Sequence, residues 1–504
     1  MVLTSAAEPA APGTSPAGAS GTEVPAALPV LRPEMSTVMQ ELLSGHADLL
    51  DDLSYAFGGP VHLLFPARFE SNVGAFRDAL SSRGVEGRIY FAKKANKAAC
   101  WVERCAALGI GIDASSPGEL REALAHGVCG PDITVTGPAK SEELLRLALL
   151  HRCLTAVDDF GELETVAGLA RSYGCGRILL RCLPPCQPSS RFGLDEEELA
   201  LALEVCREVD DHVALEGFSF HLSGYDVQPR ADTAGQLLDQ CRKARKLGLH
   251  PGVINIGGGF PVNYVGPHAW DAWERNHRDQ PASLFHGGKT FGGFYPYHSP
   301  VSGSEMLGAV LDATPTGERE SLATLLCREG VTLAVEPGRS LLDQAGLTVF
   351  RVQGVRGGVR VRDYGILTVD GTSLSLSEQW FNSEFLPDPV LVPAEPAPNQ
   401  SGQSVPGVPS VPSGGPPGPV GEEPFAACVG GASCLEVDML SWRKILFPRR
   451  PQVGDLLAYV NTAGYQMDSN ESGFHDLALP PKVVVEHVEQ RGGRARWRLD
   501  RHQR

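Results

Sequence analysis

The sequence predicts an α/β protein: a (β/α)8 barrel of the TIM type, followed by a second, mainly β domain that is β-barrel-like. Three observations lead to this fold class. Short apolar runs alternate with amphipathic stretches over the first two thirds of the chain, and eight such runs can be counted. Beyond them the pattern changes to short β-like runs separated by turn residues. At 504 residues the chain is also too long for one ordinary hydrophobic core.

The alternating part of the chain supplies the barrel. An apolar run at 61–65 and a helix-like stretch at 71–82 come first. The eight predicted barrel strands are 88–94, 110–114, 132–136, 154–157, 177–182, 216–222, 253–256 and 332–336. The predicted helices between them include 97–108, 117–126, 141–151, 160–173, 196–209 and 233–247. Strands that alternate with helices in this way favour a closed parallel barrel over an open sheet.

Composition sets the predicted domain limits. Residues 1–32 are rich in Ala, Pro, Gly, Ser and Thr, and we expect a disordered leader there. Residues 33–60 form a lead-in segment that is expected to pack with the β domain. The barrel is predicted for 61–339 and the β domain for 340–504.

Two insertions interrupt these domains. Residues 387–424 are dense in Pro, Gly, Ser and Val, so we predict a disordered surface loop. The insertion 260–302 carries the aromatic residues Trp270, Trp273, Phe291, Phe294, Tyr295 and Tyr297. We expect it to form an ordered cover over the barrel mouth, which either contributes to substrate choice or shields the barrel rim.

The bulk properties exclude several classes of partner. A formal net charge of −16 disfavours binding to nucleic acid or to an anionic membrane. No segment is long and apolar enough to span a bilayer, and the first residues lack the pattern of a secretory signal, so a cytoplasmic location is predicted. The twelve cysteines show no metal-binding or disulfide spacing. We therefore expect reduced thiols and predict no metal site.

Two adjacent lysines end the first predicted barrel strand. Side chains alternate across a strand, so Tyr90 and Lys94 share one face while Lys93 lies on the other. Only one of the two lysines can then point into the barrel. An inward, desolvated lysine is expected to have a lowered pKa and to form a Schiff base with an aldehyde. The alternative interpretation is two surface lysines at a strand end.

Other reactive residues lie at the ends of barrel strands, where the active sites of such barrels form. They are Asp113, His221, the three glycines Gly257, Gly258 and Gly259, and Glu336, which is followed closely by Gly338 and Arg339. The loops after the seventh and eighth strands commonly bind phosphate, so the glycines and Arg339 predict a phosphate site. Combined with a lysine and an inward carboxylate, this site indicates a pocket for pyridoxal 5'-phosphate (PLP).

These residues resemble the motifs of the PLP-dependent amino-acid decarboxylases of the alanine-racemase-like fold, which include diaminopimelate, ornithine and arginine decarboxylases. The resemblance extends over about residues 60–485 outside the two insertions. In that family the Schiff-base lysine directly precedes Ala-Asn, which selects Lys94 over Lys93. The similar segments are 111–120, 190–193, 254–260 and 336–339, which match the second-strand, Ser-Lys-Phe-Gly, glycine-loop and pyridine-binding motifs.

The C-terminal domain extends the resemblance. Cys434 and Asp438 are similar to the family's Cys-Glu-Ser-Gly-Asp motif, and Ala463-Gly464-Tyr465 is similar to its Ala-Gly-Ala-Tyr ending. In the family, that cysteine and acidic residues reach the active site of the partner subunit, which implies a homodimer with shared active sites. Substrate contacts are implied for Asp370, Cys434, Asp438 and Tyr465, and cofactor contact for Tyr465. Taken alone, Cys434 would be interpreted as a structural cysteine.

Three positions depart from the family pattern. The family's His-Ile-Gly-Ser is replaced by His221-Leu222-Ser223-Gly224, so Ser223, the candidate phosphate contact, is displaced. Leu435 stands where diaminopimelate decarboxylases have a glutamate that contacts the far end of the substrate. The segment 369–380 contains no arginine to bind a substrate carboxylate. Diaminopimelate is therefore a poor candidate substrate.

The resemblance implies decarboxylation of an amino acid on PLP held by Lys94. Glu336 would keep the pyridine nitrogen protonated, His221 would stack on the ring, and Cys434 of the partner subunit or Lys94 would return a proton to the α-carbon. One alternative is an amino-acid racemase on the same fold, which an arginine near the pyridine nitrogen would favour. The other alternative is a non-catalytic PLP-binding regulator.

Overall fold

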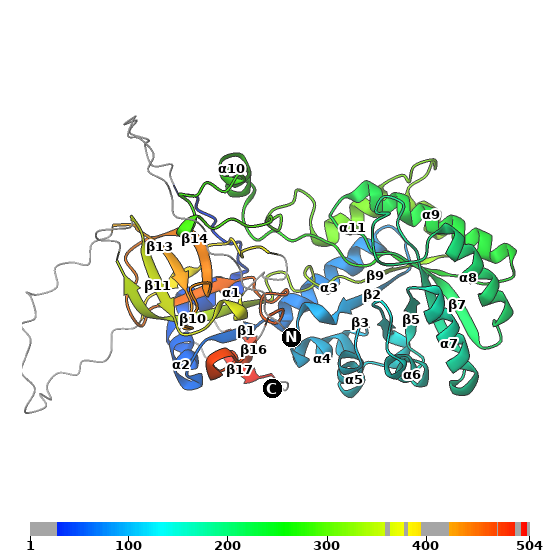
Figure 1. The fold of residues 1–504 in the computed structure, drawn as a ribbon, viewed down its shortest axis with the longest axis horizontal. Helices are drawn as coiled ribbons and strands as arrows, with labels where there is room; N and C mark the ends of the chain where they lie inside the picture. The colour runs from blue at the N-terminus through cyan, green and yellow to red at the C-terminus, as the bar shows by residue number, and fades with distance from the viewer. Residues whose placement is uncertain are drawn as a thin grey trace, which may run out of the picture.

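The computed structural model describes residues 28–357, 363–376, 382–394, 423–470, 472–488 and 495–500. A barrel of strands wrapped in helices lies beside a second domain built mainly of β-strands (Figure 1). The disorder predicted for 1–27 and for 395–422 falls outside the described residues.

Eight parallel strands close into a barrel in the order β2-β3-β4-β5-β6-β7-β8-β9. They are Gly87–Ala92 (β2), Gly111–Ala114 (β3), Ile133–Val135 (β4), Leu154–Val157 (β5), Gly176–Arg181 (β6), Val213–Ser219 (β7), Val253–Asn255 (β8) and Thr332–Val335 (β9). The predicted (β/α)8 barrel is thus confirmed. Several strands end before their predicted ends, because the polar and glycine residues at the barrel mouth leave the hydrogen-bonded ladder.

Helices cover the outside of the barrel. They are Pro66–Ser81 (α3), Ala99–Leu108 (α4), Pro117–Ala125 (α5), Glu142–Leu150 (α6), Phe160–Tyr173 (α7), Glu196–Glu208 (α8), Val227–Lys246 (α9), Gly303–Asp312 (α11) and Leu322–Glu329 (α12). Several begin at a capping side chain that accepts a backbone N–H three residues on, as Ser116, Ser141, Asp159 and Asp195 do. Within the described ranges, no helix has the length and apolar character needed to cross a bilayer.

The two faces of β2 enter different cores. Tyr90 joins one apolar residue from each of four other strands inside the barrel, namely Leu154, Leu179, Val253 and Ala334. Ile89 and Phe91 point outward, and the Phe91 ring meets that of Phe69 on α3 at 5.3 Å between centroids. Because faces alternate along a strand, this arrangement fixes which side chains can approach the barrel mouth from β2.

The second domain contains a nine-stranded sheet with the order β14-β13-β11-β10-β1-β16-β17, in which β15 pairs with β10 and β12. Its strands are Val61–Leu64 (β1), Gly346–Arg356 (β10), Gly365–Val369 (β11), Val390–Val392 (β12), Phe425–Gly430 (β13), Met439–Phe447 (β14), Leu456–Val460 (β15), Lys482–His487 (β16) and Arg496–Leu499 (β17). Helices Thr37–Gly45 (α1) and Ala47–Phe57 (α2) pack on this sheet.

Strand β1 corrects a predicted domain limit. It pairs antiparallel with β10 and parallel with β16, so it belongs to the sheet of the second domain although the barrel was predicted to begin at residue 61. The short run between two helical stretches resembles a barrel strand locally. Its partners lie more than 280 residues further along the chain, as the pairing of Val61 with Val349 shows, and no local signal identifies them.

Parts of both segments predicted to be disordered are ordered. Leu31 is fully buried, and its N–H donates to Asp388 Oδ2 at 2.8 Å. The short apolar run of β12 pairs with β15, so Val390–Val392 also join the sheet. Each segment holds a few apolar residues next to its Pro-rich part, and these residues find partners in the β domain.

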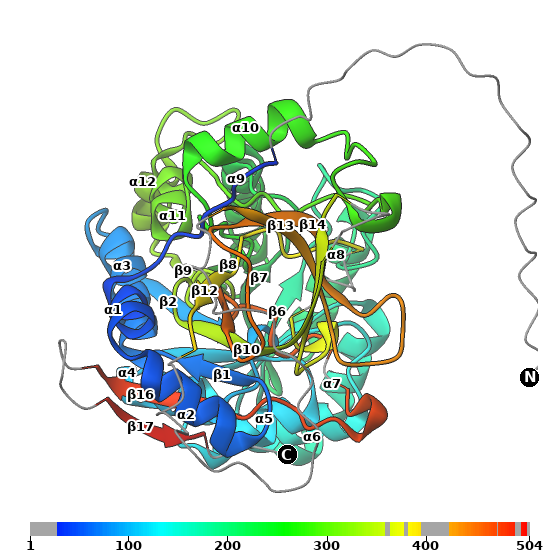
Figure 2. The same ribbon diagram turned by 90° about the vertical axis from the view of Figure 1, so that its left-hand side faces the viewer.

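The insertion 260–302 packs mainly into the β domain, which corrects the prediction of a cover over the barrel mouth. Its helix Pro267–His277 (α10) lies over β13 and β14 (Figures 1 and 2). Trp270, Trp273, Phe285 and Tyr297 share an apolar core with residues of β10, β11 and β13. Only the two ends of the insertion approach the barrel mouth, through Tyr264 and Tyr295, which contact Arg339.

A buried histidine in β1 predicts an acid-sensitive fold. Burial, assisted by the charge of Lys482, lowers the pKa of His62 from 6.5 to about 3, and its Nδ1 lies 2.9 Å from Thr348 Oγ1. Below pH 6.5 the unfolded chain therefore binds a proton on His62, whereas the folded chain does not. The contribution of His62 to stability is lost as pH falls from 6.5 toward 3. Between pH 6.5 and 5 the loss from this group is about 2 kcal/mol. Urea unfolding of the wild type and of His62→Gln at both pH values isolates this contribution: the change in stability between the two pH values should differ by about 2 kcal/mol between the two proteins, and an identical pH dependence would contradict this.

Candidate functional site

A cavity of about 220 Å³ lies at the carboxyl ends of the barrel strands. Its walls include the side chains of Lys94, Ser115, Thr136, Arg181, Phe192, His221 and Glu336. Three of these residues were predicted from the sequence to form an active site. Because they come from the ends of different strands, the barrel itself brings them together.

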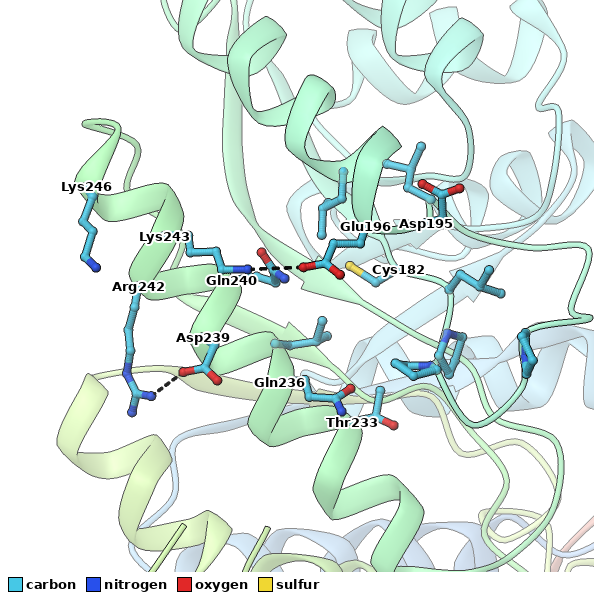
Figure 3. A pocket seen from close by; sticks show the side chains of 17 residues that line it. Cys182, Asp195, Glu196, Thr233, Gln236, Asp239, Gln240, Arg242, Lys243 and Lys246 are labelled. Carbon is cyan, nitrogen blue, oxygen red and sulfur yellow. Dashed lines mark hydrogen bonds and ion pairs between the residues drawn. The ribbon is translucent and has the colours of Figure 1, made fainter. Parts of the chain in front are cut away.

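A larger cavity, about 680 Å³, lies elsewhere, between α8, α9 and the loop after β6 (Figure 3). Prolines and leucines form much of its wall, and Glu196 and Lys243 face each other at its edge at 3.8 Å. It contains none of the predicted site residues. Size alone therefore does not identify the reactive site, and the smaller cavity in the barrel mouth holds the reactive groups.

The two lysines after β2 have different environments. They lie on a short 3-10 turn, Lys93–Ala95, that directly follows the strand. Lys93 is buried, with its Nζ 3.3 Å from Glu122 Oε2 and 2.9 Å from the carbonyl oxygen of Lys97. Lys94 lines the cavity, and its Nζ lies 3.0 Å from Asp113 Oδ2. The lysine selected from the sequence is therefore the one in the barrel mouth.

The prediction of a lowered pKa for Lys94 is wrong. Burial acts to lower the pKa, but Asp113, the phenol of Tyr465 and Glu336 outweigh burial and raise it. The side chain is 48 % exposed and lines the cavity, whose protein walls limit its solvation. Lys94 is thus an ammonium in this structure. It must give up a proton before it can attack an aldehyde, and Asp113 is positioned to accept it.

Two carboxylates flank this lysine. Asp113 is buried at the end of β3 and also accepts a hydrogen bond from the hydroxyl group of Thr136. Glu336 follows β9 and accepts a hydrogen bond from Asn255 Nδ2 at 2.7 Å. Burial and the charge of Asp113 raise the pKa of Glu336 to about 7, while Lys94 opposes this shift. Glu336 is thus held in place by one bond and remains able to pair with a cation.

His221 lies next to the glycine loop. Burial lowers its pKa to about 4, and the nearby charges of Lys94 and Arg181 add to the effect, so the ring is neutral at physiological pH. A side chain at Gly257 would bring its Cβ to 2.9 Å from His221 Nδ1, and this glycine also has a φ of +68°. A neutral, fixed imidazole in this position can stack on a flat ring.

The glycine loop has open hydrogen-bond donors. Gly257 N–H donates to Asn255 Oδ1 at 2.9 Å. The N–H groups of Gly258, which is buried, and of Gly259 have no acceptor among the residues that the structure describes. A buried N–H without a partner is rare and is commonly satisfied by a ligand. The loop therefore fits a phosphate group, as predicted from its glycines.

Arg339 does not line the cavity. Its guanidinium donates to Tyr264 Oη at 3.0 Å and lies 4.2 Å from the ring centre of Tyr295 and 4.9 Å from that of Tyr465. Arg339 thus lies in a tyrosine cluster, part of which comes from the insertion 260–302, and the phosphate contact predicted for it stays a prediction. Gly338 next to it is required for close packing, since a Cβ there would meet Tyr465 Oη at 3.1 Å.

Tyr465 is the one residue of the β domain among the predicted set that approaches Lys94 in the same protomer. Its backbone N–H donates to the carbonyl of Ala95 at 2.8 Å, and its φ is +77°. The phenol contributes to the raised pKa of Lys94. Tyr465 is therefore placed to contact a bound cofactor.

The remaining predicted residues lie outside this cavity. The carboxylate of Asp438 accepts the N–H groups of Ser373 at 2.7 Å and Ser433 at 3.1 Å, and Asp370 Oδ1 accepts the N–H of Arg351 at 2.8 Å. These bonds hold both carboxylates within the β domain, and neither residue lines this cavity, so the predicted substrate contacts stay predictions.

Two further predicted positions also lie away from the cavity wall. Cys434 is exposed, with Sγ 3.2 Å from His475 Nε2. The backbone N–H of Ser223 donates to Gln187 Oε1 at 3.1 Å, and Ser223 does not line the cavity. The phosphate contact of Ser223 therefore stays a prediction, and any contact of Cys434 with an active site requires a second subunit.

Several cavity residues were missed from the sequence. Arg181 ends β6, pairs with Asp158 at 2.9 Å and lies over the ring of Phe192 at 4.4 Å. Its position at the carboxyl end of a predicted barrel strand could have identified it as a candidate site residue. Asn255 fixes both Glu336 and Gly257, but an asparagine at the end of a short apolar strand gives no chemical hint.

Comparisons with known proteins identify the family of the chain. The model of the pyridoxal-binding domain of pyridoxal-dependent decarboxylases matches residues 67–290. The chain is 37% identical over 463 residues to the uncharacterized protein y4yA of Sinorhizobium fredii, covering 92% of this chain and 95% of that protein. It is 26% identical to diaminopimelate decarboxylase of Bacillus subtilis, covering 87% of this chain and 89% of the enzyme.

Solved structures share the fold. Diaminopimelate decarboxylase from M. jannaschii has a TM-score of 0.63 at 18% identity, covering 86% of this chain and 89% of that chain. Lysine/ornithine decarboxylase from Vibrio vulnificus, complexed with putrescine, has a TM-score of 0.62 at 18% identity, covering 90% and 99%. With the lysine, the carboxylates and the open glycine loop, these matches show that the chain is a divergent member of the PLP-dependent amino-acid decarboxylase family.

Proposed function

We propose that the protein decarboxylates an amino acid other than diaminopimelate, with Lys94 as the residue that holds PLP. The observation that carries this proposal is the position of Lys94, the only lysine among the lining residues, beside Asp113 and in the field of Glu336. Bound PLP supplies an electron sink for the charge left on the α-carbon when CO2 departs.

The residues of the cavity have distinct proposed roles. Asp113 takes the proton that Lys94 must lose, Glu336 holds the proton on the pyridine nitrogen, and the neutral imidazole of His221 supports the ring face. A glutamate rather than an arginine at the pyridine position favours decarboxylation over racemisation. Leu435, in place of a glutamate, and the lack of an arginine at 369–380 disfavour diaminopimelate as the substrate.

A screen of amino acids tests this function. Purified protein with PLP is incubated with each amino acid, CO2 release is measured, and exchange of the α-proton is followed in deuterium oxide. A decarboxylase releases CO2 from at least one amino acid and yields the corresponding amine. Exchange of the α-proton without CO2 would instead identify a racemase, and binding of PLP with neither reaction would identify a regulator.

We further propose a homodimer in which Cys434 of the partner subunit reaches each cavity, and a cytoplasmic location. Exposure of Cys434 outside its own cavity supports the shared site. Inactive Lys94→Ala and Cys434→Ala proteins, mixed and allowed to exchange subunits, should recover about a quarter of wild-type CO2 release, since half of the dimers are mixed and each mixed dimer has one intact site. No recovery despite subunit exchange, checked with two tags of different mass, would exclude shared sites.

A further inference from the structure

A buried arginine that the sequence did not single out lies next to the glycine loop. Arg230, in the first half of α9, is fully inaccessible to solvent. Its Nη1 donates to the carbonyl oxygen of Ile256 at 2.9 Å, and its Nη2 lies 3.4 Å from that of Gly224 and 3.5 Å from that of Gly259. The guanidinium therefore bridges the loop after β7 and the glycine loop after β8.

This guanidinium has no acidic partner. Among the described residues no carboxylate forms an ion pair with Arg230, and its Nε has no hydrogen-bond acceptor. Burial lowers its pKa to about 10, so it remains charged at neutral pH. Burying an unpaired charge is costly, and buried charges are normally paired. An anion that binds beside Arg230 would reduce this cost.

The glycine loop is shaped around this side chain. A Cβ at Gly259 would lie 2.7 Å from Arg230 Nη2, so the guanidinium occupies the space that a side chain at Gly259 would need. Arg230 donates only to carbonyl oxygens, those of Ile256 and Gly259 in this loop and that of Gly224 in the loop after β7. The N–H groups of Gly258 and Gly259 are left without a described acceptor. The guanidinium at the loop's carbonyl groups and the open N–H donors of the same loop together favour the binding of an anion.

The two residues expected to bind the phosphate make other contacts in this structure. The N–H of Ser223, which carries no charge, donates to Gln187, and the guanidinium of Arg339 lies in the tyrosine cluster. From these contacts we infer that Arg230 is a positioning residue for the cofactor phosphate: it fixes the glycine loop through its carbonyl groups and places a positive charge behind it. This inference rests on PLP occupying the proposed site. Arg230 acts through the loop and not on the reacting atoms.

The test compares PLP with pyridoxal, which has the same aldehyde and ring but no phosphate. Dissociation constants for both are measured with Arg230→Gln from the absorbance of the lysine adduct. Glutamine keeps an N–H donor for the loop carbonyls but removes the charge. We expect PLP affinity to fall about 10- to 100-fold, the range for a hydrogen bond to a charged group, while pyridoxal affinity changes much less. Arg230→Lys, which keeps the charge, should recover most of the preference for PLP.

Arg242→Gln is the matched control, because Arg242 lies on the same helix and pairs with Asp239 at its surface. It should leave both dissociation constants unchanged. An equal loss for PLP and pyridoxal in Arg230→Gln, or no loss for either, would overturn the inference. If Arg230→Gln does not fold, the preference for PLP over pyridoxal, given by the ratio of the two dissociation constants, is compared between Arg230→Lys and the wild type. Because Arg230→Lys keeps the positive charge, loss of this preference in Arg230→Lys would contradict a role based on charge. Failure of the wild type to bind PLP at all would instead refute the proposed site.

Discussion

Lys94→Ala should abolish both the near-visible absorbance of bound PLP and CO2 release. The lining residues of the cavity include no other amine that could hold the aldehyde, and Asp113 would lose the ammonium that it faces at 3.0 Å. We expect turnover to fall by about 10³-fold or more, within the range that a positioned acid-base group contributes. Absorbance spectra with added PLP and CO2 release from the best amino acid measure the two effects.

Lys93→Met is the matched control, because it changes the neighbouring lysine of the same turn. Lys93 is buried in an ion pair with Glu122, so replacing Lys93 breaks this pair and should cost about 3 kcal/mol of stability. Absorbance and CO2 release should remain at a temperature where the variant is folded. Retained absorbance in Lys94→Ala, or its loss in Lys93→Met, would show that the wrong lysine has been assigned.

The selection of Lys94 over Lys93 shows which features of the fold could be predicted from the sequence. Tyr90 faces the barrel interior and Phe91 faces the helices, as strand alternation predicts. The alternation of apolar strands and capped helices identified all eight barrel strands, because both patterns are local. The 3-10 turn after β2 also kept Lys93 and Lys94 on different sides, although neither belongs to the strand.

The environment of Lys94 could not be predicted in the same way. Its raised pKa depends on Asp113 in β3, on Glu336 directly after β9 and on Tyr465 from the β domain. These residues meet only in the folded chain. Arg230 is a similar case, since an arginine in a long polar helix is ordinarily a surface residue, and only the approach of Gly224 and Gly259 gives it a buried position.

The insertion 260–302 was placed wrongly for a related reason. Its aromatic residues correctly predicted an ordered segment, but the composition of a segment does not identify the residues against which it packs. The β-domain residues Phe350, Val352 and Leu367 that complete its core lie beyond the barrel in the sequence. The interior of each domain was thus predictable, whereas contacts between distant segments were not.

Glu336→Gln should reduce kcat about 10²- to 10³-fold with PLP still bound. The amide preserves the size of the side chain and can still accept from Asn255, but it cannot carry the negative charge that holds a proton on the pyridine nitrogen. Loss of one such electrostatic group typically costs this factor in kcat. Lys94 remains, so the near-visible absorbance should persist, and CO2 release separates the two effects.

Glu384→Gln provides the matched control for this substitution. Glu384 is also buried, and burial likewise raises its pKa to about 7, but it lies in the β domain and accepts the backbone N–H of Arg443. Removing its charge tests whether any buried glutamate affects turnover through stability alone. We expect kcat to be near wild type in Glu384→Gln and strongly reduced in Glu336→Gln. Equal effects in both variants would mean that Glu336 acts on the fold, and a wild-type kcat in Glu336→Gln would exclude it as the partner of the pyridine nitrogen.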